Sequence, residues 1–187
     1  MTTATQKVGF RHMIDGTTQD YKLLATNAPT ADDVMAMALG FLRALDQESP
    51  YQITRYEHSL QTGTRAMNDG ASEELIVCAL LHDIGDVISP ANHSAVSADI
   101  LRPYVSDRNY AIVRHHGAFQ MYYYAHHYGM DRNVRDAFKD EPWYDDCVEF
   151  CEKWDQTAFD PDYETYPLER FLPMVSSIFH REPAFGT

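Results

Sequence analysis

Apolar residues recur along this chain at the three- and four-residue spacing of one helix face, and no segment shows the alternation of a half-buried strand. The stretch from about residue 31 to 46 is a clear case, with Thr30 and Asp32 as candidate caps at its start. Its apolar positions are Val34, Met37, Ala38, Phe41, Leu42 and Leu45. The pattern predicts an all-α protein.

Pro, Gly and capping residues divide the rest of the chain into further predicted helices. Ser72 is a candidate N-cap for the next apolar run, Gly117 is expected to allow a bend, and Pro142 is expected to open a helix. Residues 1–30, with a short helix from Thr18, are expected to wrap the core. The other predicted helices cover about 52–68, 72–83, 93–101, 107–116, 131–138 (weakly helical), 142–155 and 167–180.

The 187 residues, 44% of them hydrophobic, fit a single domain at 1–187 with its functional core at about 51–155. Cys78, Cys147 and Cys151 form no CxxC pair, which favours reduced core residues. Without a signal-peptide pattern or a membrane-length apolar run, we expect a cytoplasmic protein. A formal charge of −13 disfavours a nucleic-acid partner and fits attraction of cations, although an acidic soluble surface has the same charge.

His82 and Asp83 end the apolar run LIVCALLHDIGD. Adjacent side chains on a helix diverge by about 100°, so these two can face two different metal ions, with the carboxylate between them. The alternative is a helix that simply ends in a hydrogen-bonded imidazole and a solvated carboxylate, and an isolated dipeptide would favour it.

Further donors at the ends of predicted helices favour the metal site. Each of these donors, considered alone, could equally be a surface residue, but the helices of a bundle can project all of them toward one interior site. Imidazoles and carboxylates without a thiolate suit iron, manganese or zinc. The candidate ligands are His58, His82, Asp83, His93, His116 and Asp155.

The order of these residues resembles the HD-domain superfamily, in which a His, an adjacent His-Asp pair and a distant Asp bind metal. His93 and His116 match the subset with dinuclear centres. Flanking motifs are similar to the mixed-valence diiron oxygenases that cleave the C–P bond of 1-hydroxy-2-aminoethylphosphonates, relatives of myo-inositol oxygenase. These motifs are EHSLQ at 57–61, ALLHDIG at 79–85, NHSAVSADIL at 92–101 and KWD at 153–155.

The resemblance implies a helical bundle with a buried mixed-valence Fe(II)/Fe(III) pair and O2 as co-substrate. One iron would be held by His58, His82, Asp83 and Asp155, and the other by Asp83, His93 and His116, with Asp83 as the shared catalytic carboxylate. His115 is an alternative to His116, and the single His before Gly in similar sequences favours His116. The expected reaction breaks the C–P bond and releases phosphate and a carboxylate.

Asp86 departs from the resemblance, because phosphohydrolases of the superfamily often carry Lys or His there and the aminophosphonate oxygenases commonly carry His. A carboxylate makes phosphate-ester hydrolysis less favourable; its role is either to recognise a cationic substrate end or to cap a loop. Tyrosines at 21, 51, 56 and 122–124 can supply cation–π contacts, although most tyrosines at such spacing are core-edge residues. We therefore expect a trimethylammonio substrate.

Six residues are candidate substrate contacts. Tyr51 would lie two helical turns before His58, and Gln120 would follow His116 by one turn if the helix continues. Arg132 and Arg135 are candidate phosphonate anchors, although arginines more often lie on a solvated face; for His126 and His127 a surface position is favoured. The substrate set is Tyr21, Tyr51, Asp86, Gln120, Arg132 and Arg135. The alternative functions are a metal-dependent phosphohydrolase and a noncatalytic metal-binding module, the latter expected to lack a ligand.

Overall fold

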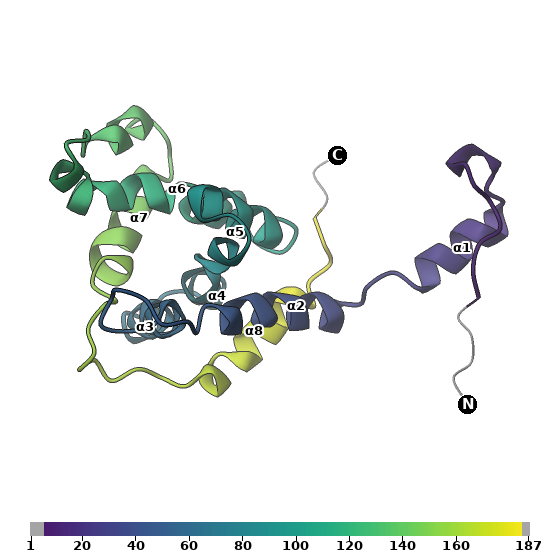
Figure 1. Cartoon of the computed structure of the whole chain (residues 1–187), viewed down its shortest axis with the longest axis horizontal. Helices are drawn as coiled ribbons and strands as arrows, with labels where there is room; N and C mark the ends of the chain where they lie inside the picture. The colour runs from purple at the N-terminus through teal and green to yellow at the C-terminus, as the bar shows by residue number, and fades with distance from the viewer. Residues whose placement is uncertain (1–5, 185–187) are drawn as a thin grey trace.

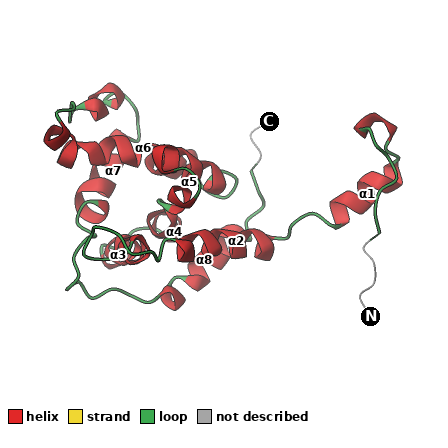
Figure 2. Ribbon diagram, in the orientation of Figure 1, coloured by secondary structure: helices red, strands yellow, loops and turns green. Residues whose placement is uncertain are grey.

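Helix α4 (Glu73–Leu81) lies at the centre of the bundle because it is apolar on nearly every side, and its last six residues are all buried. The structure is a computed structural model that describes residues 6–184. In it α4 packs against α3 (Arg55–Asn68), α6 (Asp107–Tyr124) and α8 (Leu172–Phe179) (Figure 1). Residues 6–184 contain helices and loops but no strand (Figure 2), which confirms the all-α prediction.

The remaining helices complete the bundle. They are α1 (Thr18–Thr26), α2 (Ala31–Ala44), α5 (His93–Leu101) and α7 (Tyr144–Glu149), with a π-helix at Phe150–Asp155 and 3-10 turns at Met13–Asp15, Ile84–Val87, Pro90–Asn92, Ala125–Tyr128, Val134–Phe138 and Leu168–Arg170. The three cysteines are buried free thiols, as predicted. None of the described helices combines the length and the apolar character needed to cross a membrane.

Local signals fix the start of α4 and the turn before it. Ser72 caps α4 as predicted, accepting a hydrogen bond from the backbone N–H of Leu75. At the end of α3, Gly70 adopts a left-handed φ of 75°, and its N–H donates to the carbonyl of Met67 while that of Ala71 donates to Ala66. This Schellman motif reverses the chain, so that α3 and α4 pack against each other.

Three predicted elements differ in the structure. Helix α6 does not bend at Gly117 but continues to Tyr124; a Cβ at Gly117 would lie 2.6 Å from Oγ of Ser94, so this glycine permits close approach of α5. The helix expected from Pro142 begins at Tyr144 and widens into the π-helix. In the weakly helical stretch 131–138, only a 3-10 turn at 134–138 forms.

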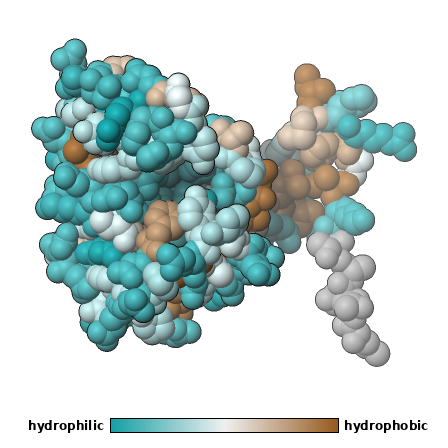
Figure 3. Space-filling view, turned by 60° about the vertical axis from the view of Figure 1, so that its left-hand side comes forward, coloured by the Kyte–Doolittle hydropathy of each residue, from teal (hydrophilic) through white to brown (hydrophobic). Residues whose placement is uncertain are grey.

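The N-terminal segment does not wrap the bundle, contrary to the prediction for residues 1–30; residues 1–5 lie outside the described part. Helix α1 contains no buried residue and stands apart from the other helices (Figure 1). Pro29 favours an extended chain before it, which carries α1 away from α2. Figure 3 shows apolar surface on this arm, where Met13, Ile14 and Leu24 are exposed.

Candidate metal centre

Four side chains from three parts of the bundle form a first donor group. His58 lies on α3, His82 caps the end of α4, and Asp155 is the last residue of the π-helix. Nε2 of His58 lies 3.2 Å from Nε2 of His82 and 3.4 Å from Oδ1 of Asp155. Both imidazole nitrogens lie 3.3 Å from Oδ2 of Asp83. These side chains are buried.

The other oxygen of Asp83 faces a second donor group. Nε2 of His93, the first residue of α5, and Nε2 of His116, in the middle of α6, each lie 3.3 Å from Oδ1 of Asp83. The two imidazole nitrogens are 3.3 Å apart. Asp83 therefore places one carboxylate oxygen in each group, as the bridging hypothesis predicts for its geometry.

The spacing of these atoms fits metal ions. Nitrogen and oxygen ligands about 2.0–2.2 Å from one ion lie roughly 3.0–3.5 Å from each other at octahedral or tetrahedral angles. The distances within the two groups run from 3.2 to 3.7 Å. The ligand atoms of His58, His82 and Asp155 all lie within 4.8 Å of one another, and so do those of His82, Asp83 and His116. The donor set is thus able to hold two ions that share Asp83.

All four histidines are oriented by backbone carbonyls on the side away from the site. Their Nδ1 atoms lie 2.9 Å from the carbonyl oxygen of Ala158 for His58, 2.7 Å from Ala79 for His82, 3.0 Å from Pro90 for His93 and 2.6 Å from Val113 for His116. A proton on Nδ1 satisfies each carbonyl and leaves the lone pair of Nε2 free to bind a metal. Metal-binding histidines typically show this arrangement.

The buried carboxylate charge of the cluster attracts cations, whether protons on the imidazoles or metal ions. Burial by itself lowers the pKa of His82, but the charge of Asp83 and hydrogen bonding to Asp155 outweigh burial and raise the pKa to about 10. The same carboxylates raise the pKa of His58 against the effect of its burial. Burial raises the pKa of Asp83, whereas His82 and Arg55 lower it well below its usual range. Both carboxylates are ionised at neutral pH, and metal ions would displace protons from the imidazoles.

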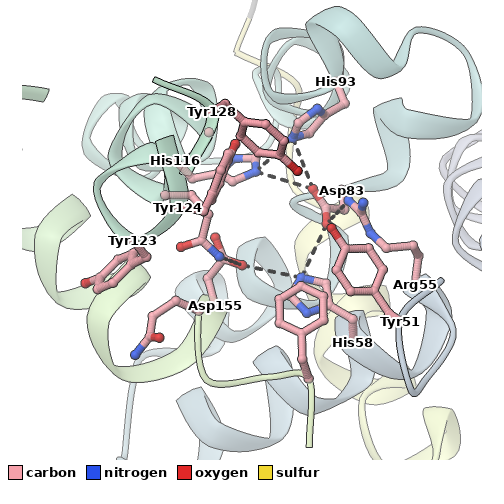
Figure 4. Close-up of a pocket in the computed structure, with 14 residues that line it drawn as sticks. Tyr51, Arg55, His58, Asp83, His93, His116, Tyr123, Tyr124, Tyr128 and Asp155 are labelled. Atoms are coloured by element: carbon pink, nitrogen blue, oxygen red, sulfur yellow. Dashed lines mark hydrogen bonds and ion pairs between the residues drawn. The ribbon is translucent and has the colours of Figure 1, made fainter. Parts of the chain in front are cut away.

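A cavity of about 470 Å³ opens beside the two donor groups (Figure 4). Phe159 forms part of its wall and stacks on His58, with ring centroids 4.2 Å apart and planes at 18°. Tyr51 packs against Phe159 at 4.8 Å. Tyr124 and Tyr128 line the cavity too (Figure 4). We call Tyr51, Tyr124, Tyr128 and Phe159 the aromatic wall.

Two predicted substrate contacts, Tyr51 and Gln120, line this cavity. Gln120 lies one turn after His116 on the unbroken α6, and its Nε2 donates to Oδ1 of Asp155 at 2.9 Å. Tyr51 reaches the cavity by another route than predicted, because α3 begins only at Arg55 and Tyr51 precedes it in a bend. Asp86 lies just behind the site, with Oδ1 at 3.8 Å from Nδ1 of His93.

The structure does not bring the other three predicted contacts to the cavity. Tyr21 lies on the distant arm, where it stacks on Phe10 and donates a hydrogen bond to the carbonyl of Met13. Arg132 and Arg135 instead stack on the ring of Tyr122, at 4.1 and 3.5 Å from its centroid.

The two adjacent histidines of α6 point to different surroundings, as a helical step of about 100° requires. His116 faces Asp83, whereas the ring of His115 stacks on Trp143 at 4.7 Å and 9°. The geometry therefore agrees with the choice of His116 over His115.

Sequence reasoning missed several residues of the cavity, among them Arg55, Tyr128 and Phe159. Arg55 precedes His58 by three residues and so shares its helix face, a signal that was available in the sequence. Phe159 follows Asp155 in a loop without periodic pattern, and no local signal marks it.

A helical bundle with two histidine-rich donor groups joined by one buried aspartate defines the class: a metal-binding helical protein. The sequence matches the HD domain family over residues 55–157, a span that contains all six candidate ligands. The chain belongs to the HD domain family. Proteins of this family are generally metal-dependent enzymes of phosphohydrolase type. No curated protein matches the chain significantly.

Proposed function

We propose that this protein is an O2-dependent mixed-valence diiron oxygenase that cleaves the C–P bond of 1-hydroxy-2-(trimethylammonio)ethylphosphonate. The organophosphonate and O2 would give glycine betaine, phosphate and one proton. In this reaction the carbon bearing the hydroxyl group is oxidised to a carboxylate carbon, and the C–P bond breaks. O2 is reduced, and both of its oxygen atoms enter the products.

The donor groups support a two-iron site. His58, His82, Asp83 and Asp155 would hold one ion, and Asp83, His93 and His116 the other. When bound, the iron ions would supply Lewis acidity for the substrate oxygens and would pass electrons from the substrate to O2. Gln120 would keep Asp155 oriented through its hydrogen bond, and the four backbone carbonyls would keep the imidazoles in the metal-binding tautomer.

The aromatic wall is the observation that carries the choice of substrate. A trimethylammonio group has no N–H to donate, so carboxylates cannot hydrogen-bond it, whereas aromatic faces attract it by cation–π interaction. Because Phe159 stacks on His58 and Tyr51 packs on Phe159, the wall adjoins the first donor group. A substrate chelated at the metals would direct its cationic end to these rings.

A metal-dependent phosphohydrolase is the second candidate, favoured by the family match and the full donor set. Such an enzyme would use a metal-bound water on a phosphate ester and would need no O2. Asp86 does not separate the two candidates, because its charge is paired with Arg55 and both a phosphate ester and a phosphonate are anions.

The deciding experiment separates the two candidates by their need for O2. Protein loaded anaerobically with Fe(II) and partly oxidised receives the trimethylammonio hydroxyphosphonate with and without O2, and phosphate, glycine betaine and O2 consumption are measured. We expect equal amounts of both products, only with O2, and a mixed-valence EPR signal that the substrate perturbs. Asp83→Ala serves as the inactive control. Phosphate release without O2 would overturn the oxygenase and favour hydrolysis.

A panel of hydroxyphosphonates with zero to three N-methyl groups tests the substrate separately. We expect kcat/KM to rise with methylation. A preference for the primary amine would contradict the trimethylammonio assignment without contradicting the oxygenase.

A further inference from the structure

The guanidinium of Arg55 sits at the edge of the cavity between two carboxylates. Its NH2 atom lies 2.6 Å from Oδ2 of Asp83, and its NH1 atom lies 3.4 Å from Oδ2 of Asp86. Figure 4 shows it beside Asp83 and Tyr51. Among the described residues that line the cavity, Arg55 is the one Lys or Arg. It is therefore the permanent positive charge of this pocket.

The position of Arg55 is fixed by the start of α3. Thr54 and Glu57 form a capping box that sets the first turn of the helix, and Arg55 is its first residue. Arg55 and His58 thus lie on one face of α3, which brings the guanidinium to the metal donors. The side chain is 24% exposed, and Asp83 and Asp86 hold it from two sides.

Arg55 has more hydrogen-bonding capacity than its contacts use. A guanidinium carries five N–H donors in a planar fork, and two carboxylate contacts leave others free. Its Nε is buried and has no hydrogen-bond partner among the described residues. A buried unpaired donor costs free energy, so Arg55 is not fully satisfied by Asp83 and Asp86.

The charge around the cavity changes sign when metals bind. With the imidazoles neutral, as metal binding requires, the carboxylates of Asp83, Asp86 and Asp155 and the guanidinium of Arg55 carry a net charge of −2. Two Fe(II) ions would turn this into a net charge of +2 and the mixed-valence pair into +3, so a phosphonate dianion would offset most or all of the positive charge. The negative charge of Asp86 is engaged with Arg55 and so does not face the anion alone.

We propose that Arg55 forms an anion-binding subsite that holds the phosphonate end of the substrate beside the metals, with Asp86 as the residue that positions it. The identity of the anion rests on the proposed function. The cationic trimethylammonio end of the substrate would lie on the aromatic wall.

The test uses methylphosphonate as the probe of the anionic end and tetramethylammonium as the probe of the cationic end. Binding of each to anaerobic Fe(II)-loaded protein is measured by calorimetry, with metal content determined on the same samples. For Arg55→Gln we expect two bound irons, a Kd for methylphosphonate raised at least about tenfold, and an unchanged Kd for tetramethylammonium. Arg108→Gln, which removes an exposed ion pair with Asp146, should change neither.

Two outcomes overturn the proposal. One is an unchanged Kd for methylphosphonate in Arg55→Gln with both irons present. The other is loss of iron from this variant, which would mean that Arg55 serves to hold Asp83. If Arg55→Gln does not fold, Arg55→Lys decides, because it keeps the charge but not the fork; we expect a Kd raised at least about threefold, and an unchanged Kd refutes the subsite.

The proposed function can be refuted while the anion-binding subsite remains supported. Wild-type protein that binds methylphosphonate through Arg55 but releases no phosphate with O2 would refute the oxygenase and leave the anion-binding subsite standing.

Discussion

Nε2 of His116 lies 3.3 Å from Oδ1 of Asp83, the carboxylate oxygen that does not face His58. Because its two carboxylate oxygens face different donor groups, Asp83 is shared by both groups. Loss of a histidine from one group should therefore leave the other group intact, whereas loss of the aspartate should affect both.

Metal content should follow this division. We expect about two ions per chain in the wild type, one in His116→Ala, and no dinuclear site in Asp83→Ala, because only Asp83 contributes to both groups. Elemental analysis of protein purified anaerobically measures this. His115→Ala, which alters the neighbouring ring stacked on Trp143, is the matched control and should keep both ions. Two ions retained in Asp83→Ala would contradict the shared carboxylate.

Tyr51 should contribute to recognition of the cationic substrate end through its ring. Replacing it by Leu removes the aromatic face, and we expect KM for the trimethylammonio hydroxyphosphonate to rise roughly 5- to 30-fold, as loss of about 1–2 kcal/mol of cation–π attraction implies. Tyr51→Phe keeps the ring and should stay within about twofold. Steady-state kinetics of phosphate release measures both. An equal rise of KM in the two variants would assign the effect to the hydroxyl group instead.

Gly85 should be required to position α5 and its ligand His93. A Cβ at Gly85 would lie 2.3 Å from the backbone oxygen of His93 and 2.9 Å from the backbone nitrogen of Ser97, so α5 would have to move. We expect Gly85→Ala to destabilise the protein by about 2 kcal/mol or more and to lower occupancy of the second metal position. Urea unfolding and metal analysis measure these effects.

The matched control for this change is Gly40→Ala. Gly40 is exposed on α2, and a Cβ there would meet nothing within 4 Å. Because Ala favours a helix over Gly, we expect a gain of about 0.5–1 kcal/mol. Similar destabilisation by both alanines would refute the steric explanation.

Glu74 should stabilise the fold in a pH-dependent way. Burial raises its pKa, but hydrogen bonds from Arg181, Ser106 and Asn109 outweigh burial and lower the pKa to about 2 from its ordinary 4.5. A lowered pKa in the folded state means that the stabilisation is complete above about pH 4.5 and is lost as pH falls toward 2.

We expect Glu74→Gln to lower the free energy of unfolding by about 1–2 kcal/mol at pH 7 and by less at pH 3. Urea unfolding at both pH values measures the difference. Glu73→Gln, one residue earlier and exposed, should change stability by less than about 0.5 kcal/mol. A difference between Glu74→Gln and wild type that is larger at pH 3 than at pH 7 would contradict the sign.

Local sequence signals predicted much of the helical framework. Helix α5 has the predicted bounds of 93–101, and α2 begins directly after the predicted cap Thr30. The predicted bend at Gly117 was wrong because of a contact with another helix: Gly117 leaves room for Ser94 of α5 and does not bend α6. Glycine marks both bends and close approaches, and the sequence alone does not distinguish them.

The sequence by itself determined the all-α framework, the order of the six candidate ligands and the pairing of His82 with Asp83, because helical periodicity and capping act over a few residues. Only the tertiary structure decided that Phe159 stacks on His58, that Arg55 reaches Asp83, and that Tyr21, Arg132 and Arg135 lie away from the cavity. The physical reason is distance along the chain: the carbonyl of Ala158 orients His58 across 100 residues, and such contacts depend on how the helices pack.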